Sequence, residues 1–422
     1  MNPRSQTFPS STPVPMCPAG CTSTMCMASG RGSLVTRNSH EKSTQQDWGA
    51  FDKIAPMSET AIPPQTLCEF LQQSGAQVHV FDMGRRLVEI PTEQMLAIEC
   101  QQAPYPQPFQ RSAMLGVLFY YQNKAGNSTE QQIWFLKFPL DEQGLLSLEA
   151  RDDFLRRIIE QLAEQTLAKR EAGKNPQAPA MVGDNPHGFT PRDDRMASFH
   201  AKVAKRLGQP PSRFYAHARD YFSGTPGFDQ WNFVGLQGIA DVAARLDEDN
   251  NLATIITAIP QLPATPLAAL CSCLENEIID PALGSVLGIR LEHALQEGDA
   301  ATVAAVLRGL SHGSDQTLLH KAIHSTLDSE TGNNVEVLAS IAGRAWQALA
   351  HSDTHHRAFL QRLALCEAGQ GAFDNIMADL MFLPCLRRPL LNSLRHLRDR
   401  GECTAQQAMI IDNFFQSLQT TD

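Results

Sequence analysis

The stretch LDEDNNLATIITAIPQLP (residues 246–263) decides how the C-terminal half of this chain folds, because its apolar residues follow the period of an α-helix. The stretch belongs to the first of three consecutive units in which leucines take matching places. Leu246 of the first unit matches Leu295 of the second, and Leu262, Leu310 and Leu363 match across all three. The match predicts three units of about 50 residues, each a triplet of short helices. Stacked units of this kind bury their apolar stripes against one another and usually present a binding surface.

The helical pattern extends over the whole segment 193–422, where prolines fall at intervals suited to helix ends. We therefore predict a curved, all-helical array of the HEAT/armadillo type (an α-solenoid) over these residues. Residues 170–192 are rich in Gly, Pro and polar residues, a composition typical of a linker. The array is thus expected to follow a separate N-terminal domain.

Residues 57–169 have the pattern of a small antiparallel α+β domain. Its predicted elements follow the order α-β-β-α-β-β-α: helix 65–74, strands 77–82 and 85–90, helix 91–101, strands 113–122 and 131–138, and helix 147–169. The dipeptide MG joins the first two strands, and the polar turn NKAGNSTE joins the next two. None of these connections is long enough for a parallel crossover, so the pairing is predicted to be antiparallel and the fold class to be α+β.

The charge of the chain is unevenly distributed. The formal net charge is −10 over 422 residues, but residues 1–56 carry five cations and three acids, a balance of +2 that leaves −12 for the rest. An acidic body disfavours nonspecific adhesion to nucleic acid or anionic lipid, since neutralising phosphates takes clustered Lys and Arg. Composition alone therefore excludes a generally basic, nucleic-acid-coating protein.

The cysteines and the N-terminus point to a cytoplasmic protein without membrane insertion. Several of the ten cysteines sit singly among apolar residues, as reduced thiols do, and no apolar stretch reaches the length of a membrane span. Residues 1–56 are rich in Ser, Thr, Pro and Met without apolar periodicity, which predicts a disordered extension. Met57 precedes a sequence typical of a natural start, so we interpret 1–56 as a mis-assigned upstream extension.

Motifs that resemble catalytic or metal sites lack the context that their chemistry needs. GLSHG (309–313) matches a nucleophile elbow, but a helix rather than a strand leads into it. The histidine pairs His320/His324 and His351/His355 are spaced one helical turn apart, but no glutamate base accompanies them and a third ligand is undefined. We therefore predict no catalytic residue, no metal site and no cofactor.

Two turns of the N-terminal domain carry candidate binding residues. FDMGRR (81–86) places Asp82, Arg85 and Arg86 at a predicted hairpin tip, where paired arginines can grip a carboxylate or phosphate. The turn after IWFLKF carries Asp141 and Glu142. In the alternative interpretation, Arg85 or Arg86 pairs with Asp141 or Glu142 and only locks the domain together.

Two basic segments of the helical half are further candidates. The segment 202–222 interleaves Lys205, Arg206 and Arg213 with rings such as Tyr215, as single-stranded nucleic acid binding requires. The segment 387–400 has a leucine stripe that leaves arginines outward, among them Arg395 and Arg398. In the alternative interpretation, neither segment binds a ligand. The rings of 202–222 then face the core, and the arginines of 387–400 form a solvated helix face.

Three segments resemble a known family: FLQQSGAQVHVFDMGRR (70–86), QAPYPQPFQ (102–110) and IWFLKFPLDEQGLL (133–146). Together they are similar to a family of uncharacterised bacterial proteins, number 3549 in the series of domains of unknown function, over about residues 60–420. The resemblance implies a bacterial cytoplasmic protein, and it implies no catalytic residue, ligand or partner. Residues 1–56 depart from the family pattern, which begins near Met57.

The leading functional prediction is a non-enzymatic protein–protein interaction or scaffold protein, with the concave face of the array and the hairpin tip (Asp82, Arg85, Arg86) as contact surfaces for an unidentified protein partner. The alternative is a nucleic-acid-associated factor that uses the cations of 202–222 and 387–400. A second alternative is an enzyme with a site at the domain junction, built from residues scattered in the sequence.

Overall fold

The computed structural model describes residues 66–121, 131–172, 185–350 and 352–419. Residues 1–56, the turn NKAGNSTE, most of the predicted linker and His351 lie outside these ranges, so the predictions made for them stay predictions. The N-terminal domain contains these elements: α1 (Leu67–Gln73), β1 (Gln77–Asp82), β2 (Val88–Ile90), α2 (Thr92–Glu99), β3 (Ser112–Tyr120), β4 (Gln132–Pro139) and α3 (Leu148–Ala172). The order α-β-β-α-β-β-α and the α+β class are confirmed.

The four strands form one antiparallel sheet in the order β2-β1-β3-β4. Asp82 pairs with both Val88 and Leu115, which aligns the outer end of β1 with β2 and β3. β2 is shorter than predicted, since residues 84–87 form a turn and only Val88–Ile90 pair. The side chains of Arg85 and Arg86 contact the helical array instead.

Both faces of the sheet are buried, because successive side chains of a strand point to opposite faces. Trp134 and Leu136 of β4 pack on one face with residues of α1, α2 and α3. Phe135 and Phe81 pack on the other face against Phe199. Phe199 belongs to α4 (Asp193–Arg206), so the first helix of the predicted array also covers the sheet.

From residue 193 on, the elements that the structure describes are all helices, as predicted. The further helices are α5 (Tyr215–Phe222), α6 (Leu236–Ala244), α7 (Asn251–Ala258), α8 (Ala264–Leu274), α9 (Pro281–Glu297), α10 (Ala300–Leu310), α11 (Gln316–Asp328), α12 (Val335–Arg344), α13 (Trp346–Ala350), α14 (Asp353–Leu365), α15 (Gly369–Leu380), α16 (Pro384–Asp399) and α17 (Ala405–Gln419). Short 3-10 turns occupy Phe228–Phe233 (η2), Ile259–Gln261 (η3) and Glu330–Asn333 (η4).

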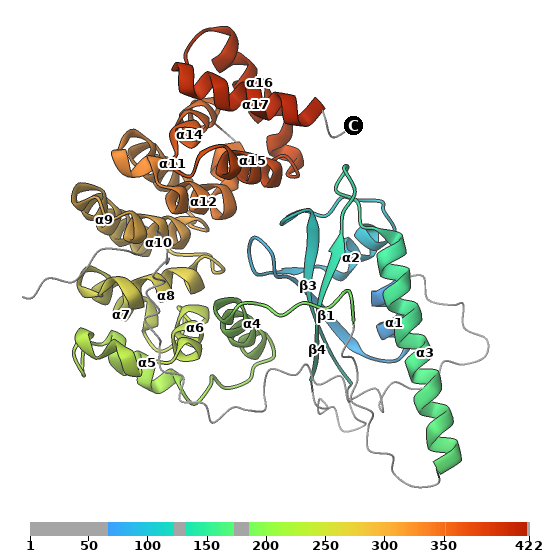
Figure 1. Ribbon diagram of the computed structural model, residues 1–422. Coiled ribbons are helices and arrows are strands. Elements are labelled where there is room, and N and C mark those ends of the chain that lie inside the picture. Colours follow the sequence, from blue (N-terminus) through green and yellow to red (C-terminus); the bar gives the residue numbers. More distant parts are fainter. Residues whose placement is uncertain (1–65, 122–130, 173–184, 351, 420–422) are drawn as a thin grey trace, which may run out of the picture. The chain divides into compact units, whose positions relative to one another are not determined.

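The repeating unit is a helix pair, not the predicted triplet. One row of helices in mutual contact is α5, α7, α9, α11 and α14, and a second row is α4, α6, α8, α10, α12 and α15 (Figure 1). The first helix of each pair begins at residue 215, 251, 281, 316 or 353, so the unit recurs every 30 to 37 residues. The matching leucines gave the wrong repeat length because they occupy different positions relative to the helices. Leu262 follows η3, Leu310 ends α10, and Leu363 lies inside α14.

The end of the predicted linker is structured. The Lys137 N–H donates to the His187 carbonyl at 2.8 Å, and the Phe189 N–H donates to the Phe135 carbonyl at 3.2 Å. Residues 187–189 therefore follow β4 as an irregular extra edge. Within the described ranges, none of the helices is both long and apolar enough to cross a membrane.

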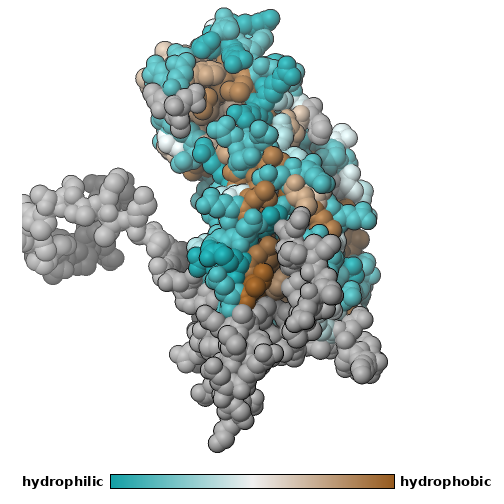
Figure 2. Space-filling view, turned by 90° about the vertical axis from the view of Figure 1, so that its right-hand side faces the viewer, coloured by the Kyte–Doolittle hydropathy of each residue, from teal (hydrophilic) through white to brown (hydrophobic). Residues whose placement is uncertain are grey.

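The face carrying α3 is mainly hydrophilic. Figure 2 shows it with a narrow strip of hydrophobic residues between hydrophilic ones. Ile159 of α3, 44% exposed, is the large exposed hydrophobic side chain of the described α+β domain. Isolated apolar residues of this kind are normal on protein surfaces and do not mark a binding site.

Candidate functional site

The turn between β1 and β2 carries two buried arginines. Arg85 is fully buried and Arg86 is 3% exposed. The Arg85 Nη2 donates to Asp379 Oδ2 at 2.7 Å, and its Nη1 donates to the Ala342 carbonyl at 3.2 Å. The prediction that this tip is an exposed contact surface is therefore wrong: the arginines bind the helical array of the same chain, and not Asp141 or Glu142.

Arg86 completes the attachment of this turn to the array. Its Nη2 donates to the carbonyls of Ser311 and Arg344, at 3.0 and 3.1 Å. Its guanidinium also lies 4.8 Å from the centre of the Trp346 ring, a cation–π distance. Two predicted contact surfaces, the turn and the array, thus bind each other.

Most acceptors of the two arginines share one structural origin, which is the C-terminal end of a helix; the other acceptors are the Pro108 carbonyl and the Gln347 side chain. Ser311 caps α10, Ala342 and Arg344 lie in the last turn of α12, and Asp379 lies in the last turn of α15. Carbonyls at such ends lack partners within the helix and carry the negative end of the helix dipole. Buried guanidiniums satisfy both needs, which explains why this turn carries arginine and not an apolar residue.

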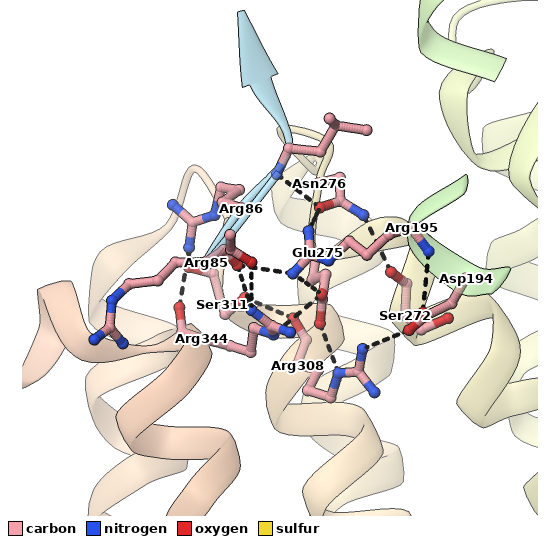
Figure 3. A network of polar contacts seen from close by, with 12 residues as sticks. Arg85, Arg86, Asp194, Arg195, Ser272, Glu275, Asn276, Arg308, Ser311 and Arg344 are labelled. Carbon is pink, nitrogen blue, oxygen red and sulfur yellow. Dashed lines mark hydrogen bonds and ion pairs between the residues drawn. The ribbon is translucent and has the colours of Figure 1, made fainter. Parts of the chain in front are cut away.

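Glu275, at the C-terminal end of α8, is the hub of the polar network (Figure 3). It is 1% exposed and contacts three guanidiniums: Arg195 at 2.9 Å, Arg308 at 2.6 Å and Arg344 at 3.1 Å. Burial raises the pKa of Glu275, but the charges of these arginines outweigh burial and leave the pKa lowered. The carboxylate is therefore held in its charged form.

Asn276 joins the same network to the β1–β2 turn. Its Oδ1 accepts from the Leu87 N–H at 3.0 Å and from Arg195 Nη1 at 2.6 Å. Lys202 donates to the Asn276 carbonyl at 2.6 Å. Glu275 and Asn276 together connect α4, α8 and the sheet.

Asp82 shapes the turn from inside. Its Oδ1 accepts from the Gly84 N–H at 2.7 Å, and its Oδ2 accepts from the Tyr105 hydroxyl at 2.6 Å. Burial raises the pKa of Asp82 to about 7, against the opposing effect of these hydrogen bonds and of Arg195 and Arg85. This carboxyl therefore titrates near neutral pH and offers no exposed surface to a partner.

The network contains more cations than anions. Burial lowers the pKa of Arg86 to about 10 and that of Arg344 to about 9, while Glu275 raises both. The charged members are Arg85, Arg86, Arg195, Arg308 and Arg344 against Asp194, Glu275 and Asp379, with Asp82 titrating near 7. The excess is positive, and part of it lines an open groove.

This groove has a volume of about 1130 Å³ and lies on the second row of helices. Its floor is made of small residues: Ala268 of α8, Ala301, Ala304 and Ala305 of α10, Ala339, Ser340, Ala342 and Gly343 of α12, and Ala378 of α15. Its charged lining consists of Arg111, Arg192, Arg308, Arg344, Glu336 and Asp379. Phe109 and Gln110 complete the side formed by the N-terminal domain.

The rim of the groove carries a strained turn. Gln110 and Arg111 have φ angles of 49° and 57°, in the left-handed region that glycine and asparagine favour. Reciprocal hydrogen bonds of 3.1 Å between Phe109 and Ser112 close the two-residue turn, and the Gln110 N–H donates to Asp379 Oδ1 at 2.9 Å. The strain is thus maintained by contacts on both sides.

The predicted residues Asp141 and Glu142 lie on an exposed turn. Asp141 Oδ1 accepts from the N–H groups of Gln143 and Leu145, at 2.9 and 2.8 Å, so it holds its own turn. The Glu142 carbonyl accepts from Arg387 at 3.3 Å. The turn therefore contacts α16 through its backbone.

The basic segment 202–222 is largely neutralised by the protein itself. Lys205 pairs with Asp247, Arg206 pairs with Glu89, and Arg219 pairs with Asp249. Tyr215, Tyr221 and Phe222 are buried, with Tyr215 at 7% exposure. Arg213 lies over the half-exposed ring of Phe214 at 4.8 Å, which leaves one aromatic–cation pair on the surface.

The basic segment 387–400 lies in α16 and its C-cap, with Leu390, Leu394 and Leu397 buried and its arginines exposed. Arg398 pairs with Asp399 at 3.2 Å and lies 5.2 Å from the Phe415 ring centre. Arg395 is exposed beside it. These cations do not converge with those of the groove.

The motifs that resemble catalytic or metal sites are structural in their geometry. Ser311 is buried at a helix C-terminus and donates to the Arg308 carbonyl at 2.7 Å. His320 and His355 come together from α11 and α14, with their Nδ1 atoms 3.3 Å apart. Among the residues that the structure describes, no three His, Cys, Asp or Glu side chains form a group that could hold a metal ion.

Sequence reasoning missed nine charged residues that build the network and the groove: Arg111, Arg192, Asp194, Arg195, Glu275, Arg308, Glu336, Arg344 and Asp379. A weak signal existed, because Arg308 and Arg344 each stand in the last turn of an alanine-containing helix, and Glu275-Asn276 directly follow the apolar run of α8. Helix ends are exposed often enough that such residues attract no attention alone. Their convergence required the tertiary structure.

Comparison with known proteins gives a family and no function. The family model described as "Protein of unknown function (DUF3549)" matches residues 64–407. Searches of the curated proteins and of the solved structures found no match. Because the family model covers most of the chain, the protein belongs to the DUF3549 family.

Proposed function

We propose that this chain is a non-enzymatic interaction protein of the bacterial cytoplasm, whose helix pairs stack as an α-solenoid and bind another protein. The observation that carries the proposal is the groove over α10 and α12, whose floor consists of small side chains. A volume of about 1130 Å³ is above the usual range for small-molecule pockets and suits a protein segment. The described cysteines are free thiols, which supports a reducing compartment.

The groove is also where an enzyme site at the domain junction would lie, but its lining favours binding. Among the described lining residues there is no histidine, cysteine, lysine or tyrosine. Asp379 is engaged by Arg85 and by the Gln110 N–H, which leaves Glu336 as the carboxylate of the lining without such a partner. Acid–base or nucleophilic chemistry normally needs at least two such groups in reach of each other.

The nucleic-acid alternative has less support than the protein partner. Four cations of 202–222, namely Lys202, Lys205, Arg206 and Arg219, are paired with acids of the protein, and three of the four rings are buried. Single-stranded nucleic acid binding needs exposed rings beside unpaired cations. Arg213 and Phe214 provide that combination at one point.

Affinity purification of the tagged full chain, with and without nuclease, tests the proposal. The matched control is Ala339→Tyr, which fills the groove from an exposed floor position. A stoichiometric protein that survives nuclease with the wild type and is lost with Ala339→Tyr is the expected result. Recovery of the same proteins with both forms, or of proteins that all disappear with nuclease, contradicts it.

A further inference from the structure

The floor of the groove allows the main chain of a ligand to come close. Ala301 and Ala305 on α10, and Ala339 and Gly343 on α12, are each spaced four residues apart and so share one helix face. A Cβ atom added at Gly343 would meet no heavy atom within 4 Å, so the space above it is open. The small side chains of α10 and α12 leave a trough, and Asn375 and Ile376 of α15 complete its lining.

The charges of the lining select the kind of segment that fits. Four arginines line the groove against Glu336 and Asp379. Asp379 pairs with Arg85, and Arg308 and Arg344 pair with Glu275, so the positive excess of the groove rests mainly on Arg111 and Arg192. This positive excess stands in a chain whose formal net charge is −10. A local field opposite to the net charge steers an acidic ligand to one place.

Two arginines of the rim are available to a ligand. Arg192 is 73% exposed, and its contact with Asp194 at 3.0 Å is shared with Arg308. Arg111 is exposed and lies 4.9 Å from the Phe382 ring centre, and among the described residues no carboxylate is within ion-pair distance of it. The strained turn at Gln110 and Arg111 places this arginine at the rim, and such strain is frequent at binding sites.

The charge of the lining differs between the two ends of the groove. Arg308 and Arg344 stand in the last turns of α10 and α12, whereas Glu336 stands in the first turn of α12. Arg308 and Arg344 contact the same carboxylate of Glu275, so the C-terminal ends of the two helices lie together. A ligand carboxylate is therefore disfavoured beside Glu336 and is favoured at the rim arginines Arg111 and Arg192.

From these observations we infer that the groove binds an acidic peptide segment with small side chains, whose carboxylates pair with Arg111 and Arg192 while its backbone lies on the alanine floor of α10 and α12. The inference rests on the proposed function and names the chemistry of the partner. Nucleic acid fits less well, because Phe109 is the single aromatic ring of the described lining.

Fluorescence anisotropy with labelled twelve-residue peptides tests the inference on the full chain. We expect an alternating Asp/Ala peptide to bind at least about tenfold more tightly than matched Gln/Ala and Lys/Ala peptides at low salt, and to weaken as salt rises. Arg111→Ala combined with Arg192→Ala should lower its affinity about five- to tenfold, as expected for two exposed ion pairs. Arg388→Ala removes an exposed arginine of α16 outside the groove and should leave the affinity unchanged.

Equal binding of the three peptides, or an equal loss with Arg388→Ala, overturns the inference. A labelled oligouridylate is the nucleic-acid arm: if it binds through Arg111 and Arg192 while the Asp/Ala peptide does not, the groove is a nucleic-acid site. If Ala339→Tyr abolishes capture of a protein partner but the Asp/Ala peptide never binds, the proposed function stands and the acidic-peptide inference fails. Circular dichroism of each variant shows whether it is folded.

Discussion

Arg85 and Asp379 lie 294 positions apart in the chain, and the Arg85 Nη2 and Asp379 Oδ2 atoms are 2.7 Å apart. The guanidinium is completely buried, whereas the carboxylate keeps 20% exposure. This pair joins the β1–β2 turn to the last turn of α15. A buried cation of this kind depends on its partner, because removing the anion leaves an uncompensated charge in a low-dielectric place.

Replacing Asp379 should therefore destabilise the protein strongly. We expect Asp379→Ala to lower the free energy of unfolding by about 3 kcal/mol, since it breaks a buried ion pair. The double variant with Arg85→Met should lose less than the sum of the single variants, because it no longer buries an unpaired charge. Urea unfolding measures all three free energies.

The exposed Lys205–Asp247 pair is the matched control. Lys205→Gln should cost under about 1 kcal/mol, as is usual for surface ion pairs. Two outcomes would show that the buried pair does not couple the domain to the array. One is an Asp379→Ala variant that is no less stable than Lys205→Gln. The other is a double variant whose loss of unfolding free energy equals the sum of the losses in the single variants.

The pKa of Asp82, raised to about 7, predicts a pH dependence of stability. The carboxyl is protonated in both states below about pH 4, the usual pKa of aspartate. The unfolded chain loses this proton at about pH 4, whereas the folded protein keeps it up to about pH 7. Stability is therefore lost as pH rises from about 4 through about 7, above which the folded protein buries the charge. Compared with Asp82→Asn, the wild type should therefore lose stability with rising pH, by at most about 1.4 kcal/mol per pH unit.

Urea unfolding of both forms between about pH 5 and 8 gives this difference. Tyr105→Phe provides a second readout, because it removes a hydrogen bond that lowers the pKa of Asp82. The midpoint of the stability loss should then move to higher pH. A difference between wild type and Asp82→Asn that stays constant with pH contradicts the prediction.

Two helical glycines should respond to alanine in opposite directions. Gly343 has open space at its Cβ position, so Gly343→Ala should stabilise α12 by about 0.5–1 kcal/mol through helix propensity. A Cβ at Gly238 of α6 would lie 2.5 Å from the Phe214 carbonyl oxygen. Gly238→Ala should therefore destabilise by about 1–3 kcal/mol despite the same gain in propensity.

Thermal unfolding of the two variants side by side measures this contrast. A stabilising Gly238→Ala would mean that α5 and α6 are less closely packed than their contact indicates. A destabilising Gly343→Ala would mean that the floor of the groove has no free space, and it would also weaken the acidic-peptide inference.

Arg111 should show opposite effects on stability and binding. Its left-handed backbone, with φ of 57°, costs about 1 kcal/mol in a non-glycine residue. Arg111→Gly should therefore raise the free energy of unfolding by up to about 1 kcal/mol, and it should also weaken binding of the Asp/Ala peptide.

Gln110→Gly is the control for the stability effect, since its φ of 49° is strained in the same way. Urea unfolding and anisotropy of the same preparations separate the two quantities. An Arg111→Gly variant that is more stable and binds the peptide as the wild type does would confine this residue to a structural role.

The sequence determined the elements of this protein, because their signals are local. QVHVFD and IWFLKF were predicted as strands and form β1 and β4, and the helix predicted from residue 147 is α3, where the Ser147 Oγ accepts from the Ala150 N–H. Helical periodicity likewise predicted the array. Its repeat length was wrong, since a leucine in a connection and a leucine inside a helix look alike in sequence.

Only the tertiary structure decided where the candidate site lies. Arg85 and Arg86 stood out in the sequence, but their acceptors include the carbonyls of Ala342, Ser311 and Arg344, which are more than 220 positions away. Every residue has a carbonyl, so no side-chain pattern marks those that a helix end leaves without a partner. Alanines of α10 and α12 read equally well as helix formers and as a groove floor, and the packing of neighbouring helices decides which of them stay open.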